Sequence, residues 1–264
     1  MVDDYNQEEI GGRLATRWLG RPLHYLPSVG STNEFLRALA QEGAPQGSLV
    51  VADYQSQGRG RRGRRWLAPA GTSVLASLLF RPGWPPERAA WLTMLAGLAA
   101  AEAIEAHCGL GVQLKWPNDL IVARGRSWAK LGGLLLEAEL SANRLEWALV
   151  GLGINVNGRP PVLPDSYGQA TSMELESGRR QNRAEFLAQL LVRIEAAYEA
   201  AAAGASPLAA WSNRLVTLGR SVVAVGKRRL EGVAEACDEW GRLLVRDGQG
   251  QLHALAAGDV SLRG

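Results

Sequence analysis

The chain has 264 residues, of which 47% are hydrophobic, and its 29 Lys and Arg against 26 Asp and Glu give a formal net charge of +3. This length is enough to bury one large core, or a large core with a small domain beside it. We find no run of about 18 uncharged apolar residues and no apolar N-terminal segment, so we expect neither a membrane span nor a secretory signal. The two cysteines lie far apart, which favours a reducing, cytoplasmic setting.

The first part of the chain predicts short helices and strands in alternation. Apolar periodicity and turn residues set their limits. Helices are expected over 5–18, 31–41 and 87–107, and strands over 23–26, 48–54, 73–80, 112–116, 120–123, 131–140 and 145–155. Ser31 and Glu34 have the spacing of a capping box, so we expect the Ser31 side chain to cap the second helix.

Beyond residue 180 the sequence predicts two helices and then a β-rich tail. The helices are expected over 183–202 and 207–215. From Ser221 onward, short alternating runs separated by glycines are typical of a small barrel-like β unit. Its strands are expected over 222–225, 230–236, 243–245, 252–255 and 260–262. We place a domain boundary near Leu218, which divides the chain into residues 1–218 and 219–264.

A strongly cationic loop joins two of the predicted strands. Residues 59–65 contain five arginines and two glycines, and without these arginines the chain has 24 basic and 26 acidic residues. Such concentrated charge predicts a focused pocket for a phosphate on a small molecule, rather than the extended basic stripe of a duplex-binding protein. Residues 58–63 match the glycine spacing of a dinucleotide-binding loop, but that motif opens a helix and this loop leads into a strand. A solvated loop without a partner is the alternative.

Three further groups of residues could carry chemistry. Residues 115–119, Lys-Trp-Pro-Asn-Asp, offer a cation, an amide and a carboxylate that could bind a nucleotide phosphate and its magnesium, although a hairpin turn with an Asx cap fits equally well. Lys130 opens an almost wholly apolar strand, so it either faces a cleft or extends along the surface to water. Asn155 and Asn157 end another buried strand, where they could bind a base or stabilise a turn. The three histidines are scattered, and we expect no metal site formed by the protein alone.

Five motifs, taken together and in order, resemble those of the biotin protein ligases. They are Ser-Thr-Asn at 31–33, the arginine-rich run at 54–66, Lys-Trp-Pro-Asn-Asp at 115–119, Lys-Leu-Gly-Gly at 130–133 and Gly-x-Gly-Ile-Asn at 151–155. The resemblance covers about residues 20–205, and the tail is similar to the small C-terminal domain of the family. It implies an α+β fold, in which helices flank a mixed β-sheet related to the class II aminoacyl-tRNA synthetase core, with an SH3-like C-terminal β-barrel.

The resemblance also implies an ATP-dependent activity in two steps. The carboxylate of biotin attacks the α-phosphate of ATP, which gives biotinyl-5′-AMP and pyrophosphate. A lysine of a biotin carboxyl carrier protein then attacks the acyl carbon and releases AMP. The implied ligands are therefore biotin and ATP with Mg²⁺.

By family position, the resemblance implies a role for each motif residue. The residues that would bind biotin or its adenylate are Ser31, Thr32, Asn33, Gln55, Gly58, Arg59, Gly60, Arg61, Lys130, Gly132 and Gly133. Those that would contact ATP and its magnesium are Trp66, Lys115, Asn118, Asp119 and Asn155. Lys130 and Arg61 would act as catalysts, because their charges would stabilise the negative charge that develops between carboxylate and phosphate.

Some features limit or compete with this interpretation. Thirty residues precede Ser31, too few for a winged helix-turn-helix of roughly 60 residues, so we expect a ligase without DNA binding, either a monomer or a homodimer. The turn at 237–241 differs from the usual turn of the family. A lipoate protein ligase of the same fold is the nearest alternative. A nucleic-acid-binding module that uses the arginine-rich loop is the alternative from another class.

Overall fold

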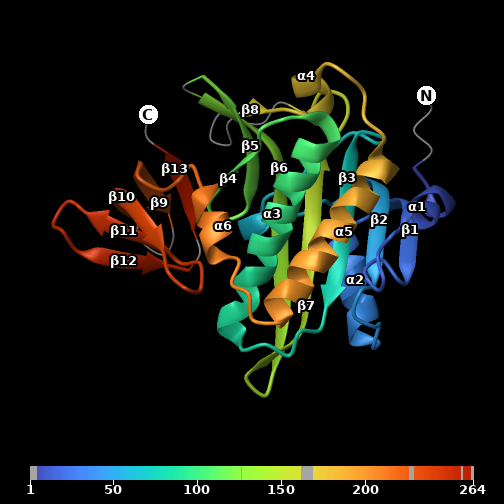
Figure 1. The fold of residues 1–264 in the computed structure, drawn as a ribbon, viewed down its shortest axis with the longest axis horizontal. Coiled ribbons are helices and arrows are strands. Elements are labelled where there is room, and N and C mark those ends of the chain that lie inside the picture. Colours follow the sequence, from blue (N-terminus) through green and yellow to red (C-terminus); the bar gives the residue numbers. More distant parts are fainter. Residues whose placement is uncertain (1–4, 126, 162–168, 226–228, 257, 263–264) are drawn as a thin grey trace.

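The computed structural model describes residues 5–125, 127–161, 169–225, 229–256 and 258–262. Within them the chain forms a large sheet flanked by helices and a separate small sheet near the C-terminus (Figure 1). This arrangement confirms the predicted α+β class and the β-rich tail.

The large sheet is mixed. Its strands, in spatial order, are β1 (Leu23–Val29), β2 (Leu49–Gln55), β3 (Ser73–Phe80), β7 (Arg144–Asn155), β6 (Ser127–Ser141), β5 (Asp119–Arg124) and β4 (Gln113–Lys115), and β8 (Gln169–Ala170) pairs with β6. The pairs β1–β2 and β6–β8 are parallel and the other pairs are antiparallel. This order places the C-terminal ends of β2 and β7 and the N-terminal part of β6 at the same edge of the sheet, although these segments are far apart in the sequence.

Helices cover both faces of this sheet. They are α1 (Gln7–Arg13), α2 (Thr32–Gln41), α3 (Ala89–Cys108), α4 (Met173–Ser177), α5 (Arg183–Ala202) and α6 (Leu208–Asn213), with short 3₁₀ turns η1 (Arg61–Gly63) and η2 (Pro86–Arg88). Successive strand residues point to opposite faces. Val51 therefore belongs to the main core, whereas Val50 packs with Leu36 of α2 on the other side. Figure 1 shows α3 and α5 together across the main-core face.

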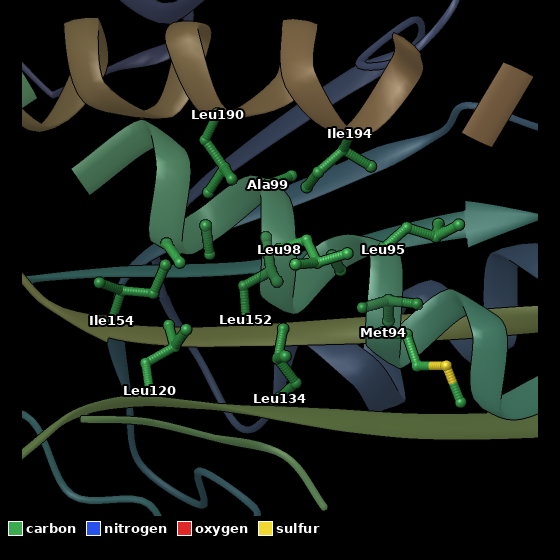
Figure 2. Packing of buried hydrophobic residues seen from close by; sticks show 14 of the residues in the cluster. Met94, Leu95, Leu98, Ala99, Leu120, Leu134, Leu152, Ile154, Leu190 and Ile194 are labelled. Atoms are coloured by element: carbon green, nitrogen blue, oxygen red, sulfur yellow. The ribbon is translucent and has the colours of Figure 1, made fainter. Parts of the chain in front are cut away.

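The main core lies between α3, α5 and the sheet. Figure 2 shows Leu95 and Leu98 of α3 between Leu190 of α5 and the strand residues Leu134 and Leu152. By length and composition the helical stretch Pro86–Cys108 could cross a membrane, with a mean hydropathy of 1.3, but 67% of that window is buried inside the protein. We therefore assign α3 to the core.

Two local predictions were wrong, and in both cases long-range contacts are the reason. The first helix ends at Arg13 instead of continuing to Trp18, because the backbone N–H groups of residues 17, 18 and 19 donate to the Glu195 carboxylate on α5. Ser31 precedes α2 as its N-cap, but its side chain makes no capping hydrogen bond among the described residues. Glu34 does not complete a capping box either, since it forms an ion pair with Arg59 at 3.0 Å.

The small sheet is antiparallel and packs against the core. Its order is β12 (Leu252–Leu255), β11 (Leu243–Asp247), β10 (Arg229–Cys237), β9 (Ser221–Val225) and β13 (Asp259–Leu262). Two core tryptophans hold the turn between β10 and β11. Trp91 Nε1 donates to Glu239 O (3.2 Å) and Trp116 Nε1 donates to Gly241 O (3.0 Å). Gly241 has a φ of 78°, and a Cβ there would lie 2.0 Å from Met94 Cε. Closure of the sheet into a barrel, and the boundary near Leu218, stay predictions.

Candidate active site

A cavity of about 350 Å³ lies where the ends of β2, β6 and β7 meet the arginine-rich loop. All but two of the predicted site residues line it. They are Ser31, Thr32, Asn33, Gln55, Arg59, Gly60, Arg61, Trp66, Lys115, Asn118, Asp119, Lys130, Gly133 and Asn155. The small sheet also reaches the cavity, through Gly258, Val260 and Ser261. The fold therefore gathers five separate motifs into one pocket.

The two remaining predicted residues, Gly58 and Gly132, lie behind this lining. A Cβ on Gly58 would be 2.5 Å from Trp66 O, and a Cβ on Gly132 would be 2.8 Å from Gly153 O. Both glycines thus let two backbone segments approach closely. The structure explains them as packing positions, and their predicted ligand contacts stay untested.

One end of the cavity, which we call the floor, consists of neutral polar residues held by hydrogen bonds. The Thr32 backbone N–H donates to Gln55 Oε1 at 2.7 Å, and Thr32 Oγ1 lies 3.1 Å from the same oxygen. Behind them Ser77 Oγ lies 2.8 Å from Thr32 Oγ1 and 2.5 Å from Asn33 Oδ1. Ser31, Thr32 and Asn33 are all buried. The start of α2 is therefore attached to both β2 and β3.

The other end, which we call the mouth, carries charge. Lys130 Nζ lies 2.6 Å from Asp119 Oδ1, an ion pair that joins β6 to the start of β5. An Arg61 N–H donates to Asn118 Oδ1 at 3.3 Å. Burial lowers the pKa of Lys115, although the Asp119 carboxylate opposes this effect. Burial also lowers the pKa of Arg61. Cations gathered this closely are suited to an anionic ligand.

The arginine-rich loop folds back on itself over the cavity. The Gly60 N–H donates to Arg64 O at 2.7 Å, and Arg59 and Arg65 form an isolated antiparallel bridge. Arg62 has a φ of 57°, at the sharp turn η1. A guanidinium N–H of Arg62 donates to the Val225 carbonyl of β9. The loop is therefore attached to the small sheet as well as to the core.

Arg59 is paired with carboxylates on two elements. Its guanidinium lies 3.0 Å from Glu34 Oε1 on α2 and 3.9 Å from Glu137 Oε1 on β6. Glu137 is also paired with Arg37. Because Arg59 was predicted to hold a ligand carboxylate or phosphate, any such contact would compete with these acidic partners.

Trp66 and Asn155, which were predicted to contact ATP, have different surroundings. The Trp66 indole lies over Gly153, where a Cβ would be 2.6 Å from Trp66 Cε2, and Lys130 Nζ lies 5.6 Å from its ring centroid. Asn155 donates from Nδ2 to Thr171 O at 3.0 Å. Its amide N–H therefore holds the chain after β8, and contact of Asn155 with adenine stays a prediction.

Comparison with known proteins places this pocket in a family. Residues 25–155 match the Biotin/lipoate A/B protein ligase family, and residues 217–263 match the Biotin protein ligase C terminal domain. The biotin--[acetyl-CoA-carboxylase] ligase of Paracoccus denitrificans is 34% identical over 234 residues, covering 86% of this chain and 95% of that protein. This chain belongs to the biotin protein ligase family. The prediction made from the five motifs is thereby confirmed.

Other members of the biotin protein ligase family extend the comparison. The bifunctional ligase/repressor BirA of Bacillus subtilis is 32% identical, with 97% of this chain and 79% of that protein covered. The biotin protein ligase of Aquifex aeolicus, solved in complex with biotin and ATP, has a TM-score of 0.73 at 30% identity, covering 90% of this chain and 97% of that one. The similarity of fold therefore extends over both sheets.

Sequence reasoning gave no role to several residues of this biotin ligase pocket. Gly151 and Gly153, which it named only as part of the fifth motif, line the cavity, Ser77 supports it from behind, and the small sheet contributes to its lining. One signal was available for Ser77, since its hydroxyl interrupts the apolar run of β3, where a polar group needs a partner. The described residues contain no group of three or more His, Cys, Asp and Glu side chains that could hold a metal ion.

Proposed function

We propose that this biotin protein ligase forms biotinyl-5′-AMP from biotin and MgATP and transfers the biotinyl group to a lysine of a biotin carboxyl carrier domain. One observation carries the proposal, namely that a single cavity joins the neutral floor to the cationic mouth. Biotin has the same asymmetry, with a neutral cyclic urea at one end and a carboxylate at the other. Magnesium enters as part of the nucleotide substrate.

The floor suits the urea end of biotin. One buried N–H donor of the floor, Asn33 Nδ2, has no hydrogen-bond partner among the described residues. A buried donor without a partner costs about 1–3 kcal/mol, so a ligand that supplies an acceptor gains affinity. We assign Ser31, Thr32, Asn33 and Gln55 to the recognition of the urea.

The mouth suits the first chemical step. A carboxylate oxygen of biotin attacks the α-phosphorus of ATP, a P–O bond forms, and the bond to pyrophosphate breaks. Both reactants are anions, so their approach needs positive charge placed in advance. We assign Lys130 and Arg61 to the carboxylate–phosphate junction, and Lys115, Asn118 and Asp119 to the MgATP phosphates. Lys130 would exchange its contact with Asp119 for one with the reacting oxygens.

The second step transfers the activated acyl group. A neutral amine from the carrier lysine attacks the acyl carbon, a C–N bond forms, and the C–O bond to AMP breaks as the amine loses a proton to solvent. The arginine-rich loop would cover the adenylate until the carrier arrives, because it crosses the cavity and contacts both sheets. Excluding water protects such a mixed anhydride from hydrolysis.

The decisive experiment incubates the protein with biotin, MgATP and a biotin carboxyl carrier domain, followed by mass measurement of the carrier. We expect a mass increase of one biotinyl group that requires ATP. Parallel reactions with lipoate in place of biotin, or without ATP, should leave the carrier unmodified. Modification by lipoate instead would overturn the assignment in favour of a lipoate ligase.

A further inference from the structure

Asn33 packs against Ser77 of β3 and Gly151 of β7, and we call these two residues the seat of Asn33. Ser77 lies on β3 directly opposite Gly151 of β7, and its side chain is fully buried behind the pocket lining. A Cβ on Gly151 would lie 2.4 Å from Asn33 Oδ1, so only glycine leaves room for the carboxamide there. Asn33 itself is only 3% exposed. The carboxamide is therefore packed against β7 and bonded to β3.

The hydrogen bonds of this seat determine which atom of Asn33 is left without a partner among the described residues. Ser77 has one hydroxyl proton, and Asn33 Oδ1, 2.5 Å away, is a carbonyl oxygen that only accepts. That proton must therefore go to Asn33. The contact of 2.8 Å between Ser77 and Thr32 then needs the single Thr32 hydroxyl proton, which leaves Gln55 Oε1 held by the Thr32 backbone N–H alone.

The Asn33 Nδ2 group is the donor that these hydrogen bonds leave for a ligand. With Oδ1 held by Ser77, Asn33 Nδ2 is buried and has no hydrogen-bond partner in the described part of the chain. Asn33 lines the cavity, but Nδ2 is closed to solvent in this structure, so a bound molecule can satisfy this N–H after a small shift of the pocket lining. The floor thus requires an acceptor, and it disfavours a ligand that presents another donor at this point.

We infer that Ser77 is a positioning and specificity-determining residue, which orients the Asn33 carboxamide so that its N–H group selects the carbonyl oxygen of a cyclic urea. The inference rests on the proposed function, because it takes biotin as the ligand. It adds that discrimination at the urea depends on a serine that does not itself line the pocket.

A matched pair of ligands tests this directly. In 2-iminobiotin an imine replaces the urea oxygen, and at neutral pH the group is a guanidinium that only donates. Binding of biotin and 2-iminobiotin is measured by calorimetry, without ATP, for the wild-type protein and its variants. Wild type should prefer biotin strongly, since its donor at Asn33 would face a second donor in 2-iminobiotin.

Two substitutions change the seat in different ways. Ser77→Ala frees the carboxamide to rotate, so biotin should bind about tenfold more weakly and the preference over 2-iminobiotin should fall by at least about tenfold. Ser77→Thr keeps the hydroxyl and should retain most of the preference. Asn33→Asp replaces the N–H donor with a carboxylate oxygen, so the preference should reverse in favour of 2-iminobiotin.

Ser48→Ala is the control, because Ser48 is also a fully buried serine, but its hydroxyl donates to Pro45 O at 2.7 Å outside the pocket. It should leave the preference unchanged. If Ser77→Ala does not fold, as judged by thermal unfolding, the Asn33→Asp result decides. An unchanged preference in Ser77→Ala, or a persistent preference for biotin in Asn33→Asp, overturns the inference while leaving the proposed function intact. A wild-type protein that does not bind biotin overturns both.

Discussion

The floor and the mouth of the pocket satisfy their polar groups in opposite ways. At the floor, neutral side chains are buried and bonded in a chain from Gln55 through Thr32 and Ser77 to Asn33, which ends in a donor that has no partner among the described residues. At the mouth, charged side chains are partly exposed and paired with one another, as Lys130 is with Asp119. A ligand therefore completes the bonding at the floor, whereas it must replace existing ion pairs at the mouth.

This difference indicates that the floor and the mouth have separate functions. Fixed neutral groups favour selectivity, because a ligand that leaves a buried polar group without a hydrogen bond binds with a less favourable free energy. Exchangeable ion pairs favour catalysis, because they hold positive charge in place before anionic reactants arrive. Changes at the mouth should therefore affect rate, and changes at the floor should affect which ligand binds.

The largest effect is expected for Lys130→Ala. Removing the ammonium that pairs with Asp119 at 2.6 Å should lower the rate of adenylate formation by about 10²–10³, the usual cost of losing a placed charge at a reacting oxyanion. Biotin binding without ATP should change much less. Pyrophosphate release measures the rate, and Arg13→Ala, which breaks an exposed pair on α1, is the control. A near-normal rate would remove Lys130 from the chemistry.

Arg61→Gly should loosen the cover over the intermediate. Arg61 bonds to Asn118 across the pocket, and a hydrogen bond from a charged group stabilises by about 1.5–3 kcal/mol, so leakage of biotinyl-AMP should rise by at least about tenfold. Leaked adenylate labels lysines of unrelated proteins, which mass spectrometry detects with albumin as the bystander. If the carrier alone is still labelled, the loop does not retain the intermediate.

Lys115→Arg should shift the pH dependence of adenylate formation. Burial lowers the pKa of Lys115, so as pH rises this ammonium loses its proton earlier than an ordinary lysine would. Activity should therefore fall on the alkaline side, and an arginine, which stays charged, should move that fall to higher pH. The pH profile of pyrophosphate release checks this. An alkaline limb that does not move would assign it to another group.

The smallest effect is expected for Glu34→Gln. It removes a carboxylate that pairs with Arg59, and exposed pairs are worth about 0.2–1 kcal/mol, so the KM for biotin should fall no more than about fivefold. Glu9→Gln removes a comparable exposed pair on α1 and should leave KM unchanged. A rise in KM for Glu34→Gln would show that this carboxylate supports ligand binding instead of competing with it.

Much of the site was predictable because its motifs are contiguous in sequence. The arginine-rich run and residues 115–119 combine charge, glycine and proline within a few positions, and each combination is rare enough to be informative. Ser77 was not predictable in this way. A serine within an apolar strand signals only that a partner exists, and here the partners lie more than forty residues away.

The element types, the two-sheet organisation and the family could be read from the amino-acid sequence alone, because periodicity, turn residues and short motifs are local information. The pairing of the polar atoms, in contrast, emerged from the folded arrangement of the chain. Glu34 bonds to Arg59 instead of capping its own helix, and Glu195 ends the first helix from across the core. Each of these pairings joins residues that are distant in the chain. Its free energy depends on how close the two groups lie and how deeply they are buried, and both follow from the fold.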